Sequence, residues 1–308
     1  MTNITIQMTN STTEMTNNTT EIRNSTTEMK MGTTEIKNGT TKIKNGTTEM
    51  TNSTTEMKNG TNSNGGTQVK ESQATKVLDT AQAFYPLNVT YRGRDLSHHG
   101  NQSSYVAIGI TYAPGPRGTA EGAMEFHHSQ SSYLALLKTG RWKQFNESIT
   151  IAFWLYLSGG SYVNIVDNAP LVNFIRQDTD NGTYSYNQDE MAVRIWYLFG
   201  RLQFDLVNSA SQSFCTLYLG DPTFGGGWRF VIASYNQSGH AFIQADNLST
   251  SKSCLPRQTL ATFPGYVRLG SVTFENWHYY FAGKMACLMF FDFMPDNKQV
   301  DQIKSACA

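Results

Sequence analysis

The chain has 308 residues, and its 24 basic and 24 acidic residues give a formal net charge of zero. A neutral chain offers no electrostatic reason to bind nucleic acid or an anionic membrane, so neither is expected as a partner. Every Phe, Tyr and Trp lies at or after Phe84, and all four cysteines lie at or after Cys215. The chain therefore divides into an N-terminal part that cannot form an apolar core and a C-terminal part that can.

The N-terminal part is a repeat. Residues 3–60 repeat with a period of seven, in units such as Asn10-Ser-Thr-Thr-Glu-Met-Thr and Asn24-Ser-Thr-Thr-Glu-Met-Lys. A coiled coil needs two apolar positions in each heptad, whereas only one recurs here. Paired threonines and several glycines also disfavour a helix. We interpret this heptad-repeat arm as disordered, and a weak helix or an oligomerising stalk is the alternative.

Almost every repeat contains a sequon for N-glycosylation. The candidate acceptors in the arm are Asn3, Asn10, Asn17 or Asn18, Asn24, Asn38, Asn45, Asn52 and Asn59. Glycosylation would make the arm a bulky, extended spacer. The alternative is that an Asn- and Thr-rich repeat produces sequons through its composition alone.

Three parts are predicted along the chain: the disordered arm at residues 1–66, a linker at residues 67–80, and one folded domain at residues 81–308. No stretch approaches the roughly 20 apolar residues of a membrane span, so none is expected. The first residues lack the basic and apolar regions of a signal peptide. Because other features indicate export, we expect the true N-terminus to lie upstream.

The folded part has the alternation of β-strands. In Ser148–Leu157, every second residue from Ile149 onward is apolar, and Thr150 and Trp154 fall on the other face. This alternation predicts a strand that packs against a core on one side. Further strands are predicted at Met191–Phe199, Arg201–Val207, Trp228–Tyr235, His240–Asp246, Tyr266–Val272 and Lys284–Phe293. Many short strands separated by turn residues predict an all-β fold, an antiparallel two-sheet jelly-roll sandwich.

The folded part also carries sequons, which repeat expansion cannot explain. Their acceptors are Asn88, Asn101, Asn146, Asn181, Asn236 and Asn247. Several of them lie in turn sequences, such as Asp180-Asn-Gly-Thr, where an acceptor would be exposed. These sites favour secretion.

One short helix is predicted at the C-terminus, over Asn297–Ala306. Asp296 can cap this helix, and Gln299 is placed to complete a capping box. Val300 and Ile303 recur at helical spacing. The face that they form is expected to rest on the sandwich.

The four cysteines can form two disulfides. Cys287 lies on the strand before the helix and Cys307 lies at the end of the helix, so a bridge between them would staple the helix to the sheet. Cys215 and Cys254 would then form the second pair. Four cysteines allow three pairings. Four reduced thiols in a cytosolic protein are the alternative.

Several segments of the folded part resemble a known family in their order and spacing. They are Phe84-Tyr-Pro-Leu-Asn, Arg94-Asp-Leu-Ser, Ala113-Pro-Gly-Pro-Arg-Gly, Gly122-Ala-Met-Glu-Phe, Ser148-Ile-Thr-Ile-Ala-Phe-Trp-Leu-Tyr, Trp228-Arg-Phe-Val-Ile-Ala-Ser-Tyr-Asn, Val267-Arg-Leu-Gly and Phe281-Ala-Gly-Lys-Met-Ala-Cys-Leu. Together they resemble the laminin-G-like jelly-roll domains of the concanavalin A-like lectin/glucanase superfamily, in particular the single-domain extracellular invertebrate type. The resemblance covers residues 84–307. It implies two curved antiparallel sheets and a binding role at the sheet rim or the concave face.

The glucanase branch of this superfamily hydrolyses glycans with carboxylates at Glu-x-Asp-x-x-Glu spacing, which places acid and nucleophile on one strand face. That spacing is absent, and the adjacent Asp189 and Glu190 would point to opposite faces of a strand. No phosphate loop or nucleophile elbow is present either. The chain is therefore predicted not to be an enzyme, and a divergent glycan hydrolase is kept as an alternative.

Two groups of residues are candidate ligand sites. The first is the aromatic run Trp277, His278, Tyr279 and Tyr280. Such a run stacks on a sugar ring, anchors a protein partner, or simply packs in the core. The second is a hypothetical calcium site, since hard oxygen ligands from loops suit this ion. Its candidate ligands are Asp167, Asp178, Asp180 and Asp246. The alternative is that they are solvated turn residues.

The sequence thus predicts a secreted or cell-surface recognition module that binds a glycan or an extracellular protein. The glycosylated arm would act as its spacer. The alternative is a structural extracellular domain that has no ligand. Calcium is the one cofactor under consideration.

Overall fold

The computed structural model describes residues 78–99, 105–129, 131–136, 145, 147–158, 168–176, 191–210, 212–220, 226–262, 265–274 and 277–307. All of them belong to one compact unit, Thr67–Ala308. The predicted repeat arm and its sequons lie outside the described residues, as do Asn101, Asn146 and Asn181. None of the helices within the described segments is long and apolar enough to cross a membrane.

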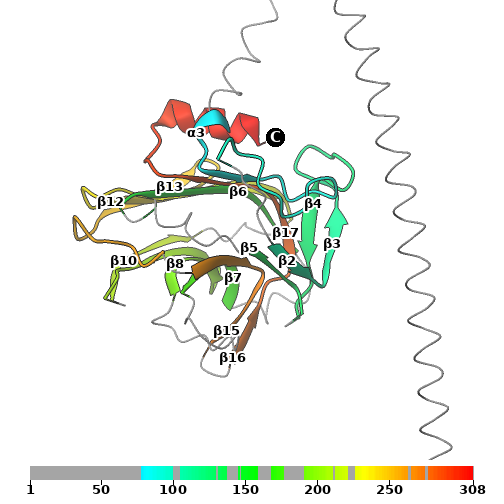
Figure 1. Ribbon diagram of the computed structural model, residues 1–308, viewed down its shortest axis with the longest axis horizontal. Coiled ribbons are helices and arrows are strands. Elements are labelled where there is room, and N and C mark those ends of the chain that lie inside the picture. Colours follow the sequence, from blue (N-terminus) through cyan, green and yellow to red (C-terminus); the bar gives the residue numbers. More distant parts are fainter. Residues whose placement is uncertain are drawn as a thin grey trace, which may run out of the picture. The chain divides into compact units, whose positions relative to one another are not determined.

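The fold is a sandwich of two antiparallel sheets (Figure 1). Sheet A has eight strands, in the order β13 (Leu248–Ser253), β12 (His240–Ala245), β11 (Trp228–Tyr235), β6 (Ile149–Leu157), β17 (Gly283–Phe291), β4 (Ala123–Phe126) and β3 (Ile110–Ala113), with β1 (Ala83–Tyr85) also pairing β17. Sheet B has seven, in the order β10 (Ser213–Gly220), β9 (Arg201–Val207), β8 (Met191–Leu198), β7 (Asn168–Arg176), β14 (Gly265–Leu269), β5 (Tyr133–Leu136) and β2 (Tyr105–Ile108). The all-β sandwich predicted from the alternation is confirmed, and β9 and β11 have the predicted bounds.

The apolar core lies between the two sheets. Phe290 of β17 and Phe174 of β7 meet there, with ring centroids 5.7 Å apart. The ring of Phe145 lies 6.1 Å from Phe290 and 6.4 Å from Phe174. The alternate residues of β6 from Ile149 to Leu157 belong to the same core. The face of β6 predicted to be buried is therefore the face that joins the sheets.

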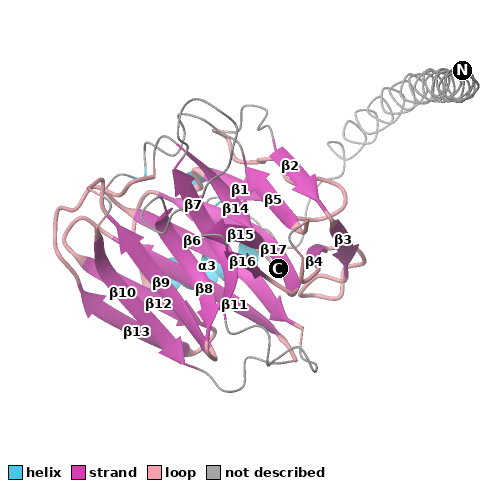
Figure 2. Cartoon of the chain, turned by 90° about the horizontal axis from the view of Figure 1, so that it is seen from below, coloured by secondary structure: helices cyan, strands magenta, loops and turns pink. Residues whose placement is uncertain are grey.

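Sheet A is also covered on its outer face, which the alternation did not predict. Trp154 of β6 packs there against Phe230 of β11, with ring centroids 5.5 Å apart. Helix α3 (Asn297–Ala306) lies over this face and contributes Val300 and Ile303 to the same apolar cluster (Figures 1 and 2). The prediction that β6 packs on one side only is therefore wrong, because a helix from the distant C-terminus covers its second face.

Helix α3 has the predicted bounds and the predicted cap. The carboxylate of Asp296 accepts a hydrogen bond from the backbone N–H of Gln299 at 2.8 Å. The side-chain oxygen of Gln299 accepts one from the backbone N–H of Asp296 at 2.9 Å. This reciprocal pair is a capping box, and it satisfies two N–H groups that the helix itself leaves without acceptors.

Two disulfides fasten the sandwich, and they are the pairs expected from the sequence. Cys287 of β17 is joined to Cys307 at the end of α3. Cys215 of β10 is joined to Cys254, which follows β13. Because β10 and β13 are the edge strands of sheets B and A, this second bridge links the two sheets at one edge.

The segment Tyr266–Val272, predicted as one strand, belongs to two. It is divided between β14 and β15 (Ser271–Phe274), and β15 pairs with β16 (Trp277–Tyr280) in a separate hairpin. Gly270 lies at the division with a φ of 94°, which only glycine adopts readily. A Cβ atom at Gly270 would lie 2.3 Å from the ring of Phe126. The strand therefore ends where the chain turns away from sheet B.

Replacing both Cys287 and Cys307 with serine should lower the free energy of unfolding. The bridge closes a loop with a sequence separation of 20 residues. Removing it should cost about 3 kcal/mol because the unfolded chain regains loop entropy. Urea unfolding followed by tryptophan fluorescence measures the loss, since Trp154 lies in the cluster that α3 covers. An unchanged unfolding midpoint would contradict the view that this bridge holds α3 on sheet A.

Candidate functional site

The β15–β16 hairpin lies against the outer face of sheet B (Figure 1). Val272 of β15 and Tyr279 of β16 face the sheet and pack with Ile175 and Tyr266. The ring centroid of Tyr279 lies 5.3 Å from that of Trp196 on β8. The hairpin therefore forms a fourth layer, on the opposite side of the sandwich from α3.

A row of polar side chains crosses sheet B beside the hairpin. Strand register places its members opposite one another on neighbouring strands: Thr216, Asp205, Arg194, Asn173 and Arg268. Asn173 is fully buried, and Asp205 and Arg268 are also buried. We call these five residues the polar row. Polar groups this deep must be hydrogen-bonded or charge-paired.

An ion pair lies at the centre of the polar row. The guanidinium of Arg194 donates to one carboxylate oxygen of Asp205. The other oxygen accepts hydrogen bonds from the hydroxyls of Ser213 at 2.8 Å and Thr216 at 2.7 Å. The side chains of Arg194 and Asp205 are 12% and 1% exposed. Asp205 is therefore charge-balanced and held by three donors, as expected of a structural anion.

Two contacts join the polar row to the hairpin. The guanidinium of Arg268 lies 3.9 Å from the ring centroid of Tyr133 and donates to the hydroxyl of Ser271, the first residue of β15, at 3.4 Å. The indole N–H of Trp196 donates to the side-chain oxygen of Asn173. Trp196 also packs on Tyr279 of the hairpin. The polar row therefore holds the hairpin at Ser271, where β15 begins, and at the side of β16 that faces sheet B.

The polar row was not predicted from the sequence. Arg194 and Asp205 lie in strands where every second residue is apolar. A charged residue between apolar ones is expected on the face of the strand that is exposed to solvent. The available signal was Trp196, an aromatic residue on the same strand face as Arg194. In the structure both side chains are largely buried, which the alternation of their strands does not indicate.

The predicted aromatic run forms β16, and its described side chains separate onto the two sides of the hairpin. Tyr279 packs on sheet B. His278 is exposed and Tyr280 is half-buried on the other side. The ring of Tyr280 lies 5.2 Å from that of His128 and 6.3 Å from that of His278. We call these three outward residues the His–Tyr–His surface. The side chain of Trp277 lies outside the described part.

Asp246, a predicted calcium ligand, links sheet A to α3. Its carboxylate accepts from the guanidinium of Arg229 at 3.3 Å and from the ammonium of Lys304 at 3.0 Å. Asp246 lies in the β12–β13 turn with a φ of 50°, which Asp tolerates better than most residues. Lys304 also lies 5.6 Å from the ring centroid of Trp154. Two cations thus already balance this carboxylate.

The other predicted calcium ligands, Asp167, Asp178 and Asp180, lie outside the described residues. Within the segments that are described, no three His, Cys, Asp or Glu side chains group closely enough to hold a metal ion. Calcium binding therefore stays a prediction from the sequence.

The predicted sequons that fall in described residues differ in exposure. Asn247 is exposed in the turn between β12 and β13, whereas Asn88 and Asn236 are half-buried. The side-chain oxygen of Asn236 accepts from the hydroxyl of Ser238 at 2.6 Å and from the N–H of His240 at 3.2 Å. Of these three acceptors, Asn247 is the one that its surroundings leave accessible to a modifying enzyme.

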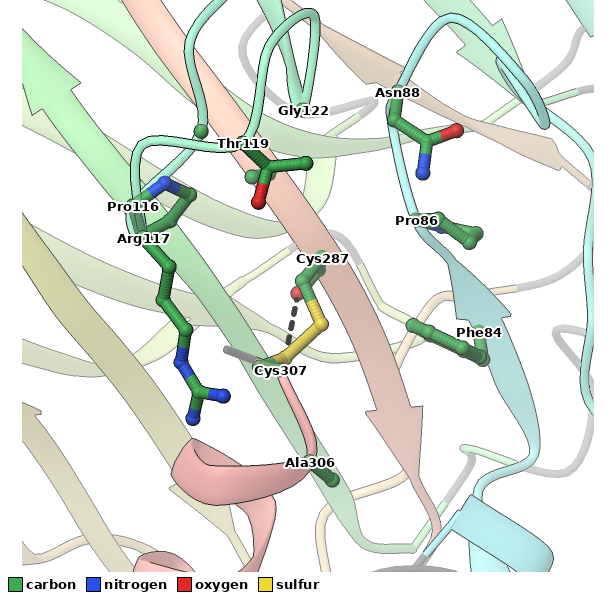
Figure 3. A pocket seen from close by; sticks show the side chains of 12 residues that line it. Phe84, Pro86, Asn88, Pro116, Arg117, Thr119, Gly122, Cys287, Ala306 and Cys307 are labelled. Carbon is green, nitrogen blue, oxygen red and sulfur yellow. Dashed lines mark hydrogen bonds between the residues drawn. A yellow bond between two sulfur atoms is a disulfide. The ribbon is translucent and has the colours of Figure 1, made fainter.

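A pocket of about 170 Å³ opens beside the Cys287–Cys307 disulfide (Figure 3). Asn88 and Arg117 lie at its rim. The guanidinium of Arg117 donates to the backbone oxygen of Ser305 at 3.4 Å, near the C-terminal end of α3, where a cation is favourable. We assign no ligand to it.

Neither a protein-family model nor a curated protein matches this sequence. Solved structures that share this fold include binding domains of toxins. The binding domain of botulinum neurotoxin serotype G is 11% identical, with a TM-score of 0.52, and the alignment covers 73% of this chain and 50% of that one. The binding domain of Paraclostridial mosquitocidal protein 1 is 12% identical, with a TM-score of 0.54, over 74% of this chain and 52% of that one.

A third similar structure contains a sugar. It is the ligand-binding domain of botulinum neurotoxin serotype D in complex with N-acetylneuraminic acid, 11% identical with a TM-score of 0.55. The alignment covers 76% of this chain and 52% of that one. This chain therefore spans about half the length of these domains. At such low identity the similarity shows the fold alone, a β-sandwich that occurs in receptor-binding domains.

Replacing Asp205 with asparagine should destabilise the fold, because it leaves the Arg194 guanidinium buried without a counter-charge. The expected loss is about 3 kcal/mol in the free energy of unfolding, measured by urea denaturation. Replacing the pair together, as Arg194→Met with Asp205→Leu, should cost less than the single change. A single variant as stable as the native chain would contradict the buried ion pair.

Replacing Asp246 with asparagine should lower the free energy of unfolding by about 1 kcal/mol, since its partners are partly exposed and water screens the pair. Asparagine also accepts the positive φ, so only the charge changes. Thermal unfolding should show the same loss in calcium and in chelator. The matched control is Asp301→Asn, an exposed position on α3. A loss seen only in calcium would instead make Asp246 a calcium ligand.

Proposed function

We propose that this chain is an extracellular recognition module, and that its His–Tyr–His surface binds a glycan or an extracellular protein. The observation that carries the proposal is the arrangement of Tyr280 beside His128 and His278 on the outward side of a firmly held hairpin. The fold also supports a binding role, since solved domains that share it are described as receptor-binding and ligand-binding domains.

The chemistry of the His–Tyr–His surface suits recognition. A tyrosine ring presents a flat apolar face to a sugar ring or an apolar side chain, and its hydroxyl forms hydrogen bonds. Each neutral imidazole offers one donor and one acceptor. Because the inner side of the hairpin packs on sheet B, few degrees of freedom are lost when a ligand binds.

The carboxylates of the described site support binding rather than hydrolysis. A glycosidase needs an acid and a second carboxylate about 5–10 Å apart beside the bond that is cleaved. On the outer face of sheet B, Asp205 is held by Arg194, Ser213 and Thr216. We therefore propose a module without catalytic activity.

An extracellular location fits the covalent features of the chain. Two disulfides persist in an oxidising compartment and are rare in the cytosol. The exposed Asn247 sequon fits passage through the secretory pathway. The arm, if it is glycosylated as its sequons predict, would hold the module away from its point of attachment.

The test is a glycan and matrix-protein array probed with the full chain, produced in a secretory host. One class of ligand should bind saturably. Replacing Tyr280 with alanine should weaken that binding about tenfold, the usual effect of removing a central aromatic anchor. His278→Ala should also weaken it, whereas thermal unfolding of both variants should stay close to that of the native chain.

Tyr91→Ala is the matched control. Tyr91 lies on a loop, is 40% exposed, and belongs to neither the hairpin nor the polar row. Equal loss in the Tyr91 and Tyr280 variants would contradict a specific role for the His–Tyr–His surface. A folded, disulfide-bonded chain that binds nothing on the array would overturn the proposed function.

A further inference from the structure

A groove of about 260 Å³ lies on the other side of the sandwich, between the β12–β13 edge of sheet A and the beginning of α3. Strand register pairs Phe242 with Ser251 and Gln244 with Ser249. All four residues line the groove, together with His240 and Asn297. Directly paired residues project from the same face of a sheet, so these two pairs form one surface beside the helix.

The polar side chains of the groove are available to a ligand. Within the described segments, the hydroxyls of Ser249 and Ser251, the imidazole of His240 and the amide of Asn297 have no hydrogen-bond partner. All four residues are exposed. They offer both donors and acceptors at the rim of one concave surface.

Apolar side chains also line the groove. Phe242 is half-buried and packs with the cluster beneath α3. Val300 and Met294 line the groove beside it. A lining that combines an aromatic ring with hydrogen-bond donors and acceptors suits ligands that have one apolar face and several hydroxyl groups.

The lack of charged side chains in the described lining of the groove favours neutral ligands over anionic ones. No Lys, Arg, Asp or Glu is among its described lining residues. The nearby Asp246 is balanced by Arg229 and Lys304. An anionic ligand would therefore lose its hydration without gaining a counter-charge.

We propose that this groove binds a single neutral sugar ring, a hexose or an N-acetylhexosamine. The ring stacks on Phe242, and its hydroxyls exchange hydrogen bonds with Ser251, His240 and Asn297. This site goes beyond the proposed function. It lies on the α3 side of the sandwich, whereas the β15–β16 hairpin lies on the opposite side (Figure 1).

Two sources can supply such a ring. One is a glycan on another molecule. The other is the chain itself, because the exposed sequon acceptor Asn247 is two residues before Ser249, which lines the groove. Ser249 is also the hydroxyl residue of that sequon, so changes at Ser249 would alter glycosylation and groove together. Ser251 and His240 are the positions that test the groove alone.

The test is ligand-observed NMR and calorimetry on the full chain, secreted with its disulfides formed. The probes are the methyl glycosides of glucose, galactose, mannose and N-acetylglucosamine, with N-acetylneuraminic acid as the anionic comparison. At least one neutral glycoside should bind the Asn247→Gln variant, with a Kd on the order of 1 mM for a single ring. N-acetylneuraminic acid should bind more weakly.

In the same background, Ser251→Val should weaken binding about fivefold, the effect of losing one hydrogen bond. His240→Leu should act similarly. Ser253→Val is the matched control, because Ser253 is an exposed serine of the same strand that does not line the groove. Binding equally affected by Ser251→Val and Ser253→Val, or no binding by any neutral glycoside, would overturn the proposal.

Comparison with the native chain identifies the source of the ring. If added glycoside binds the Asn247→Gln variant but not the glycosylated native chain, the groove holds the chain's own glycan. If both bind equally, the groove takes a sugar from another molecule. Neither result depends on Tyr280. A loss of binding at this groove can therefore be distinguished from a loss of binding at the His–Tyr–His surface.

Discussion

The buried charge on the outer face of sheet B is the constraint on which the candidate site depends. Arg194 and Asp205 lie almost entirely out of water, and each would be very unfavourable without the other. The hydroxyls of Ser213 and Thr216 also donate to Asp205, which offsets part of the cost of removing its carboxylate from water. The β15–β16 hairpin packs on the same face of sheet B, where Tyr279 meets Trp196. Arg268 and Trp196 in turn hold the hairpin, so the site and its support stabilise each other.

The two outer faces of the sandwich are covered by different means. On sheet A, α3 is held by an apolar cluster, a disulfide and the contacts of Asp246 with Arg229 and Lys304. On sheet B, the hairpin is held by the polar row and aromatic packing. The two proposed binding surfaces lie on these covers. One is the outward side of the hairpin, and the other is the groove beside α3.

Local patterns in the sequence predicted the parts of the fold that depend on local chemistry. The core-facing residues of β6, the capping box of Asp296 and Gln299, and the two cysteine pairs all agree with the structure. The break at Gly270 was missed because apolar residues lie on both sides of this glycine, and its positive φ and close approach to Phe126 are visible only in the structure. The polar row was missed because the alternation of its strands does not indicate that its charged residues are buried. Trp277 to Tyr280 were predicted as one cluster, but strand pleating turns neighbours to opposite sides.

The central claim is that ligands meet this chain at the His–Tyr–His surface. The most direct measurement is NMR of the histidine rings while the ligand class found on the array is titrated into the full chain. The ring signals of His128 and His278 should shift progressively, with little change at His98 and His99, which lie on a separate loop. Saturable binding that leaves His128 and His278 unchanged would contradict this claim.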